Sequence, residues 1–217
     1  MPFTDLAETR LSGSPQLRNE PVQARSAARL TALLDAAAAV IDQIGYERLT
    51  TAMVAERAGA SIGTVYRYFP DRIALLQALA TRNLDRLLAK MLRDVADATH
   101  STFSSAFGAA LDTYVNELRT APGFRALRCG DVLDLRPAPS PTTYTSQIAD
   151  ELLASFASRF GIENSTDSQF AIQTAIEVTA ALGSRAFARD NNGDSAFLEQ
   201  SRTIVRSVLA AQFGSAA

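Results

Sequence analysis

The strongest constraint on the fold of this chain comes from residues 49–75, where residues that start and stop helices recur at short intervals. Thr50 stands before a short run and can accept a hydrogen bond from one of the unpaired N–H groups at the start of a helix. Gly59 ends that run, because glycine readily adopts the left-handed conformation of a helix stop. Ser61 can cap a second short helix over residues 62–68 in the same way. The spacing predicts two short helices around a tight turn, which is the outline of a helix-turn-helix.

The second short helix has two unlike faces. At 100° per residue, Val65 and Phe69 share an apolar face that can pack on the first short helix. The opposite face carries Gly63, Thr64 and Arg67 and is small and polar. A glycine inside a helix costs about 1 kcal/mol relative to alanine, and close approach of a phosphate backbone is the simplest reason for Gly63. Arg67 can make a two-pronged contact with guanine or with phosphate, so the pattern favours a surface that contacts DNA.

With these features, residues 50–75 resemble the N-terminal DNA-binding domain of the TetR family of transcriptional regulators. The family signature combines a Thr-capped helix, an (I/V)A-x-x-AG turn and a recognition helix of the form (G/P)-T-(L/V)-Y-x-(Y/H)-F. The matching residues are Thr50, Val54, Ala55, Ala58, Gly59, Gly63, Thr64, Val65, Tyr66, Tyr68, Phe69 and Leu75. Two positions depart from the family pattern: Met53 replaces the usual acidic residue of a capping box, and Arg72 replaces the usual Lys after the recognition helix.

The resemblance implies a ligand-responsive transcriptional repressor. Such a protein is a homodimer that binds a palindromic operator in double-stranded DNA, with half-sites about one helical turn, ~34–36 Å, apart. A small hydrophobic effector releases it. The residues expected to contact DNA are Thr50, Ser61, Ile62, Gly63, Thr64, Tyr66, Arg67, Tyr68 and Arg72. Among them Arg67 is expected at the floor of the groove, and Ile62 either meets a thymine methyl group or turns inward.

The remainder of the chain predicts an all-α fold of about nine helices, because apolar residues recur at helical spacing and no alternating β-branched run competes with them. The expected helices span residues 25–44, 51–58, 62–68, 72–96, 102–119, 124–129, 142–160, 167–189 and 195–213. We divide the chain into a disordered arm over 1–23, a three-helix helix-turn-helix domain over 24–71, and an effector-binding and dimerisation domain over 72–217. The long fourth helix, which begins at Arg72, joins the last two.

Members of the family keep an effector pocket in the C-terminal domain and form homodimers through their last two helices. The apolar side chains expected to line such a pocket are Phe103, Phe107, Tyr114, Phe124, Leu127, Tyr144, Phe156, Phe160, Phe170 and Ile176. The residues expected at the dimer interface are Ile172, Ile176, Thr179, Leu182, Gly183, Leu198, Val205, Val208 and Leu209. Core residues would give the same pattern in both sets.

Charge and cysteine content agree with this assignment. Residues 1–93 hold 12 Lys and Arg against 9 Asp and Glu, whereas residues 94–217 hold 9 against 14, which favours a DNA-binding N-terminal part. The single cysteine, Cys129, excludes an intramolecular disulfide and indicates a reducing, cytoplasmic location. We expect no signal peptide and no membrane span, because no apolar run approaches the ~18 residues that a span needs.

The sequence shows no pattern typical of catalysis. The single histidine, His100, is expected at a turn, with no Cys/His cluster, carboxylate pair or glycine-rich phosphate loop beside it. We therefore expect no catalytic residue, no metal site, no cofactor and no enzyme activity. Two alternatives stay open: an activator, or a regulator of the same fold that answers to a protein or to oxidation of Cys129, and an all-α small-molecule-binding protein that has lost DNA binding.

Overall fold

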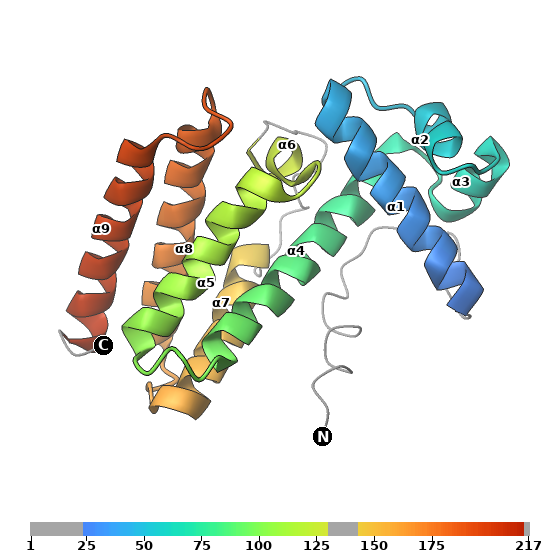
Figure 1. Ribbon diagram of the computed structural model, residues 1–217. Helices are drawn as coiled ribbons and strands as arrows, with labels where there is room; N and C mark the ends of the chain where they lie inside the picture. Colours follow the sequence, from blue (N-terminus) through green and yellow to red (C-terminus); the bar gives the residue numbers. More distant parts are fainter. Residues whose placement is uncertain (1–23, 130–142, 215–217) are drawn as a thin grey trace. The chain divides into compact units, whose positions relative to one another are not determined.

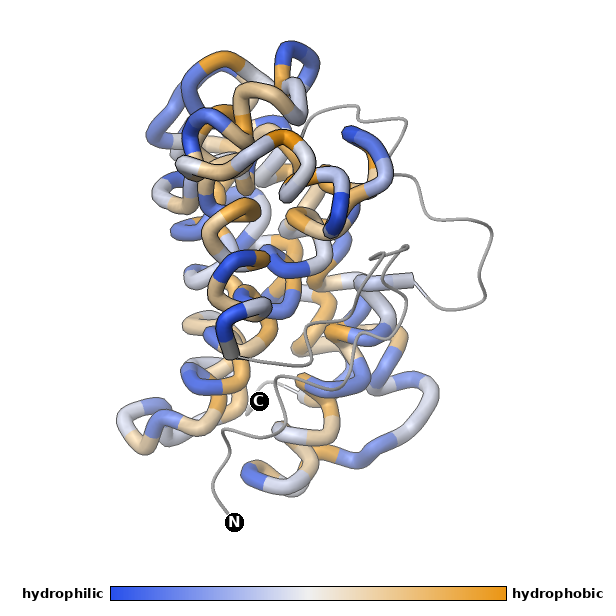
Figure 2. The backbone as a smooth tube through the Cα atoms, turned by 90° about the vertical axis from the view of Figure 1, so that its right-hand side faces the viewer, coloured by the Kyte–Doolittle hydropathy of each residue, from blue (hydrophilic) through white to orange (hydrophobic). Residues whose placement is uncertain are grey.

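The computed structural model describes residues 24–129 and 143–214, so the predicted arm over residues 1–23 lies outside the described part. The described residues form nine helices and no strand, which confirms the all-α prediction (Figure 1). The helices are α1 (Ala24–Ile44), α2 (Thr51–Arg57), α3 (Ile62–Tyr68), α4 (Arg72–Ala96), α5 (Phe103–Thr120), α6 (Phe124–Cys129), α7 (Tyr144–Phe160), α8 (Thr166–Phe187) and α9 (Ser195–Phe213). Hydrophobic and hydrophilic stretches alternate along them, as expected for amphipathic helices (Figure 2).

The short helices begin where the sequence predicts them. The Thr50 hydroxyl accepts a hydrogen bond from the Met53 amide at 3.2 Å, and the Ser61 hydroxyl accepts one from the Thr64 amide at 3.1 Å. Gly59, between α2 and α3, has a φ of 59°, a left-handed conformation that most other residues adopt at a cost. These caps and this turn fix the helix-turn-helix.

The chain divides into two units. Among the described residues, we call 24–85 with 121–129 the head unit, and 86–120 with 143–214 the helical unit. The division differs from the boundary predicted after residue 71, because the first part of α4 and all of α6 belong to the head unit. The physical reason is packing: Leu75, Leu76 and Leu79 of α4 are completely buried in the head core, and Leu127 of α6 joins the same cluster.

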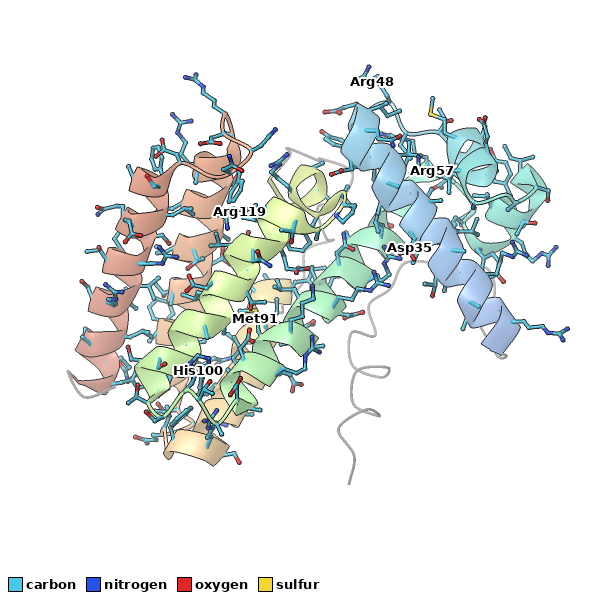
Figure 3. The ribbon with its side chains drawn as sticks, in the orientation of Figure 1. Asp35, Arg48, Arg57, Met91, His100 and Arg119 are labelled. Carbon is cyan, nitrogen blue, oxygen red and sulfur yellow. The ribbon has the colours of Figure 1, made fainter. Side chains whose placement is uncertain are left out.

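The head core gathers buried side chains from α1, α2, α3, α4 and α6. Two contacts fix neighbouring helices on α1. Arg82 of α4 forms an ion pair with Asp35 of α1 at 2.6 Å, and Asp35 is marked in Figure 3. Gly123, just before α6, has a φ of 70°, and a Cβ atom there would lie 3.0 Å from the backbone oxygen of Ala38. The close approach of α6 to α1 therefore requires glycine at position 123.

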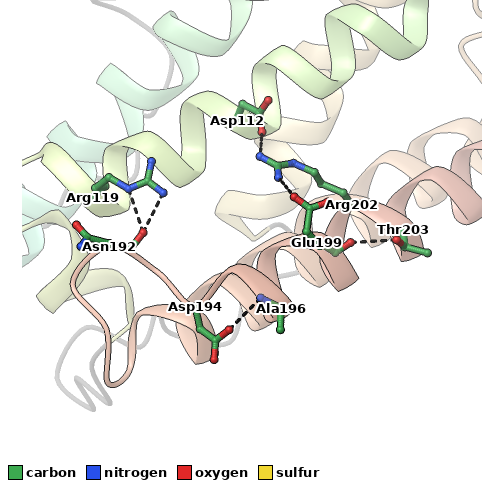
Figure 4. A network of polar contacts seen from close by, with 8 residues as sticks. All are labelled: Asp112, Arg119, Asn192, Asp194, Ala196, Glu199, Arg202 and Thr203. Carbon is green, nitrogen blue, oxygen red and sulfur yellow. Dashed lines mark hydrogen bonds and ion pairs between the residues drawn. The ribbon is translucent and has the colours of Figure 1, made fainter.

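The helical unit is centred on α8, which packs against α5, α7 and α9. Polar contacts also join α5 to α9 and to the loop that precedes α9 (Figure 4). Arg202 of α9 forms an ion pair with Asp112 of α5 at 2.8 Å, and this hydrogen bond raises the pKa of the guanidinium. Arg119 of α5 donates to the backbone oxygen of Asn192 at 2.9 and 3.1 Å. Within the described ranges, no helix combines the length and apolar character needed to cross a membrane.

Candidate nucleic-acid interface

The outward face of α3 is the centre of the candidate site. Val65 and Phe69 are completely buried in the head core, as their shared helical face predicts. Gly63 and Arg67, on the other side of the helix, are exposed, and Thr64 is half-buried. In the part of the chain that the structure describes, the Arg67 guanidinium has no hydrogen-bond partner, so its donors are available to an outside acceptor.

Other polar groups on and beside α3 are already held within the chain. The Ser61 and Thr64 hydroxyls lie 2.9 Å apart, and the Thr51 hydroxyl donates to the Tyr66 hydroxyl at 3.3 Å. The second contact places the exposed Tyr66 ring next to the start of α2. No spacing rule predicts a role for Thr51, because this contact joins residues 15 positions apart on different helices.

Tyr68, which was expected to contact DNA, is turned inward in this chain, and its DNA contact remains a prediction. Its side chain is only 5% exposed, and its hydroxyl lies 2.9 Å from the Ser26 hydroxyl of α1. The last turn of α3 therefore rests on α1 through Tyr68. Its ring belongs to the inward face because position 68 lies next to Val65 on the helical wheel.

Gly63 is not required by the packing of the chain itself. A Cβ atom at this position would meet only the Ser61 hydroxyl oxygen, at 3.8 Å, an ordinary contact distance, and the glycine has no positive φ. Alanine would therefore fit here and would favour the helix by roughly 0.5–1 kcal/mol. Close approach by another molecule therefore remains the predicted reason for a glycine in α3.

Arg72, in the first turn of α4, has partners that the sequence did not predict. Its guanidinium donates to the backbone oxygens of Tyr46 at 2.6 Å, Leu49 at 2.9 Å and Glu47 at 3.4 Å. These oxygens belong to the loop between α1 and α2, so Arg72 fastens α4 to the start of the helix-turn-helix. The predicted phosphate contact of Arg72 remains a prediction, beside this positioning role.

Comparison with known proteins agrees with this geometry. Residues 33–79 match the family model described as bacterial regulatory proteins, tetR family, and residues 101–213 match the tetracyclin repressor-like C-terminal domain. The chain belongs to the TetR family. The two matched regions cover α2, α3 and α5–α9 in full, so TetR-type sequence extends through both units.

Individual proteins and one solved structure show how far the likeness extends. The HTH-type transcriptional repressor KstR of Mycobacterium tuberculosis is 43% identical over 68 residues, which are 31% of this chain and 31% of that protein. KstR of Mycolicibacterium smegmatis is 43% identical over 58 residues, 27% of this chain and 28% of that protein. The chain therefore matches about a third of the length of these curated relatives. A crystal structure of a TetR-family transcriptional regulator from Streptomyces coelicolor has a TM-score of 0.70 and 30% identity, and the match covers 85% of this chain and 99% of that one.

The residues predicted to line an effector pocket do not come together as one set. Phe103, Phe107 and Phe156 are buried and in ring contact, with centroids 4.9–5.8 Å apart, and Phe160 and Phe213 extend this aromatic cluster. Tyr114 and Ile176 are also buried in the helical unit, and Tyr144 is half-buried. A hollow of about 20 Å³, a volume that fits about one water molecule, lies between α5, α8 and α9. It is lined by Leu111, Asp112, Val115, Thr179, Leu198, Ser201 and Arg202.

Three other predicted pocket residues also lie outside the aromatic cluster. Phe124 and Leu127 lie on α6, which belongs to the head unit, and both are buried. Phe170 is 71% exposed on α8. The sequence pattern could not separate these residues from the aromatic cluster, because an apolar residue of a helix can face a core, a pocket or solvent at the same spacing.

The predicted dimer interface also needs correction. Of its nine residues, Leu182 and Val208 are half-buried, and the other seven are buried within this single chain: Ile172, Ile176, Thr179, Gly183, Leu198, Val205 and Leu209. Most of this stripe therefore forms the packing of α8 on its neighbours. At Gly183, for example, a Cβ atom would lie 3.2 Å from Leu118 of α5, so glycine lets these two helices approach.

Proposed function

We propose that this chain is a ligand-responsive transcriptional repressor that binds a palindromic operator as a homodimer in the cytoplasm. The observation that carries the proposal is the outward face of α3, where the exposed Arg67 has no partner in the described part of the chain and Gly63 leaves open space. A helix that presents such a face fits the major groove of B-DNA, where arginine can donate two hydrogen bonds to guanine. The family model of bacterial regulatory proteins, tetR family, matches residues 33–79 and so includes this region.

For the effector, we propose a small, largely apolar molecule that enters the aromatic cluster of the helical unit. Phe103 packs edge-on against Phe156 at 4.9 Å and against Phe213 at 5.0 Å. An apolar ligand can replace such ring contacts with its own. Release from DNA requires only that the ligand bind more tightly to the form of the dimer that does not fit the operator; a coupling of about 1–3 kcal/mol changes operator affinity by roughly 5–150-fold.

For the homodimer, we propose that the outward faces of α8 and α9 meet a second copy of the chain. Phe170, Glu177 and Ala181 are exposed and share one face of α8, opposite the buried stripe. On α9 the face opposite its buried residues carries Gln200 and Thr203, both exposed. Phe170 is the large apolar group on this surface, and its burial in a dimer explains an exposure of 71% in the single chain.

DNA selection tests the central part of this proposal. The full chain is used to enrich duplexes from a random pool, and the affinity of the enriched duplex is compared with that of unrelated DNA by gel shift. Arg67→Ala should weaken specific binding by about 1–3 kcal/mol for each recognition helix. Arg189→Ala is the matched control, because it removes an exposed arginine from the helical unit. An unchanged sequence preference in Arg67→Ala, or no enrichment at all, would remove the proposal.

The dimer and the effector are tested together by native mass spectrometry of protein purified gently from its own host. A dimer that carries an additional small mass supports both proposals and defines the effector class. A bare dimer leaves the effector to ligand screening. A stable monomer would contradict the paired recognition helices.

The alternatives predict different results. If the protein is an activator, deletion of its gene lowers reporter expression, whereas deletion of a repressor gene raises it. A redox-responsive regulator changes its operator affinity on oxidation, and Cys129→Ser removes that change. A small-molecule-binding protein without DNA function enriches no duplex in the selection.

A further inference from the structure

Ile62 is an apolar residue at the start of the outward face of α3. Its side chain is 46% exposed, so the structure decides between the two orientations that the sequence allowed: Ile62 turns outward. Four of the five large hydrophobic side chains found exposed in the described residues lie in the head unit, and they are Met53, Ile62, Tyr66 and Ile73. Ile62 and Tyr66 are four residues apart on α3 and therefore form one ridge.

The outward face of α3 has a fixed order of side chains. At 100° per residue, Ile62 lies at one edge, followed by Tyr66, Gly63 and Arg67, over an arc of roughly 140°. The Tyr66 hydroxyl is held by Thr51 of α2. Ile62 and Arg67 therefore lie at the two edges of this face. Gly63 lies between them and adds no side chain to the helix surface.

The major groove offers one apolar group to a side chain in this position. Each base pair presents hydrogen-bond donors and acceptors there, and only thymine adds a methyl group, at C5. If an isoleucine covers the donors and acceptors of another base, it removes them from water without offering a hydrogen bond. Against thymine, the same side chain buries a methyl group instead.

We propose that Ile62 selects thymine in each operator half-site by contact with its C5-methyl group. The inference rests on the proposed function, because it needs α3 in the major groove. It adds a base preference to that function. Each half-site holds a thymine that contacts Ile62 on one side of α3 and a hydrogen-bond acceptor that contacts Arg67 on the other side.

The test uses the duplex enriched by selection with the full chain. Each thymine in one half-site is replaced in turn by deoxyuridine, which lacks the methyl group and keeps the same hydrogen-bonding groups. Binding of the wild-type chain, Ile62→Ala and Ile73→Ala to each duplex is measured by fluorescence anisotropy. Ile73 is a matched control, because it is 40% exposed in the head unit but lies on α4. Thermal unfolding checks that both variants fold.

At one thymine, deoxyuridine should weaken wild-type binding by about fourfold, the value expected for loss of one buried methyl group. Ile62→Ala should bind the thymine and deoxyuridine duplexes equally at that position. Ile73→Ala should keep the fourfold difference. The double comparison assigns the methyl contact to Ile62, since a general loss of affinity does not remove the distinction between the two bases.

Two results overturn the inference while the proposed function stands. In the first, deoxyuridine weakens binding no more at one thymine of the half-site than at the others. In the second, Ile62→Ala retains the full difference in affinity between the thymine and deoxyuridine duplexes. If the selection enriches no duplex at all, the proposed DNA-binding function itself fails, and the inference fails with it.

Discussion

The head unit and the helical unit treat their exposed surfaces differently. α3 is a seven-residue helix that buries Val65 completely in the head core and leaves Ile62 and Arg67 exposed. α8 and α9 are long helices that bury most of their apolar stripe within the chain, leaving smaller and more polar residues outside, with Phe170 as an exception. The comparison teaches that a surface for binding another molecule is identified by the side chains that stay exposed once the chain has packed its own core. A periodic pattern of apolar residues alone does not identify such a surface.

The largest expected effect separates internal packing from association at α8. Ile172→Ala should destabilise folding by about 2–5 kcal/mol, because Ile172 is completely buried and its truncation leaves a cavity. Phe170→Ala is the matched comparison: its stability at a concentration where the chain is monomeric should stay within about 0.5 kcal/mol of wild type, while its dimer dissociates more readily.

Chemical unfolding and sedimentation over a range of protein concentrations measure both quantities for these variants. The comparison fails if Ile172→Ala leaves monomer stability unchanged and weakens only the dimer, because Ile172 would then belong to the interface and not to the core. It also fails if Phe170→Ala has no effect on dissociation.

A smaller effect concerns Arg72 and separates a positioning role from a phosphate contact. Arg72→Ala should lower the free energy of unfolding by about 1–3 kcal/mol, because backbone oxygens of the α1–α2 loop lose their donors. Arg57→Ala, which removes a single 3.3 Å contact with Gln43, should cost less. If Arg72 acts through the loop alone, the slope of log affinity against log salt concentration for operator binding stays as in wild type.

The same measurement of operator affinity against salt concentration detects a phosphate contact of Arg72. Loss of one phosphate contact for each recognition helix reduces the magnitude of that slope by about 0.9 per contact. A reduced slope with unchanged stability would show that Arg72 binds DNA and does not hold the loop.

The sequence was sufficient for the helices and for the burial of Val65 and Phe69 on the inward face of α3. Thr50, Gly59 and Ser61 act locally, through caps and a left-handed turn, so their effect can be read from nearby residues. Tertiary contacts were beyond the same reasoning. Nothing in the spacing indicates that Tyr68 reaches Ser26 across 42 residues, or that Arg72 finds the carbonyls of a preceding loop.

The boundary between the two units also depends on tertiary contacts that the sequence pattern does not show. α4 has one continuous helical pattern, so the sequence offered no sign that its first part belongs to the head core and the remainder to the helical unit. Gly123 explains why α6 belongs to the head unit, but only the close approach to Ala38 reveals the reason for that glycine. Long amphipathic helices show which face is buried, and they do not show what buries it.

The most direct test of the account is to measure folding stability and operator affinity for Gly63→Ala. The free energy of unfolding of the variant should stay the same or rise by up to roughly 1 kcal/mol, because the added methyl group makes only an ordinary contact with Ser61 and favours the helix. Its specific DNA affinity should fall, because the same methyl group keeps α3 away from the groove. Full operator affinity in a stable Gly63→Ala protein would contradict the claim that the outward face of α3 is the DNA-reading surface.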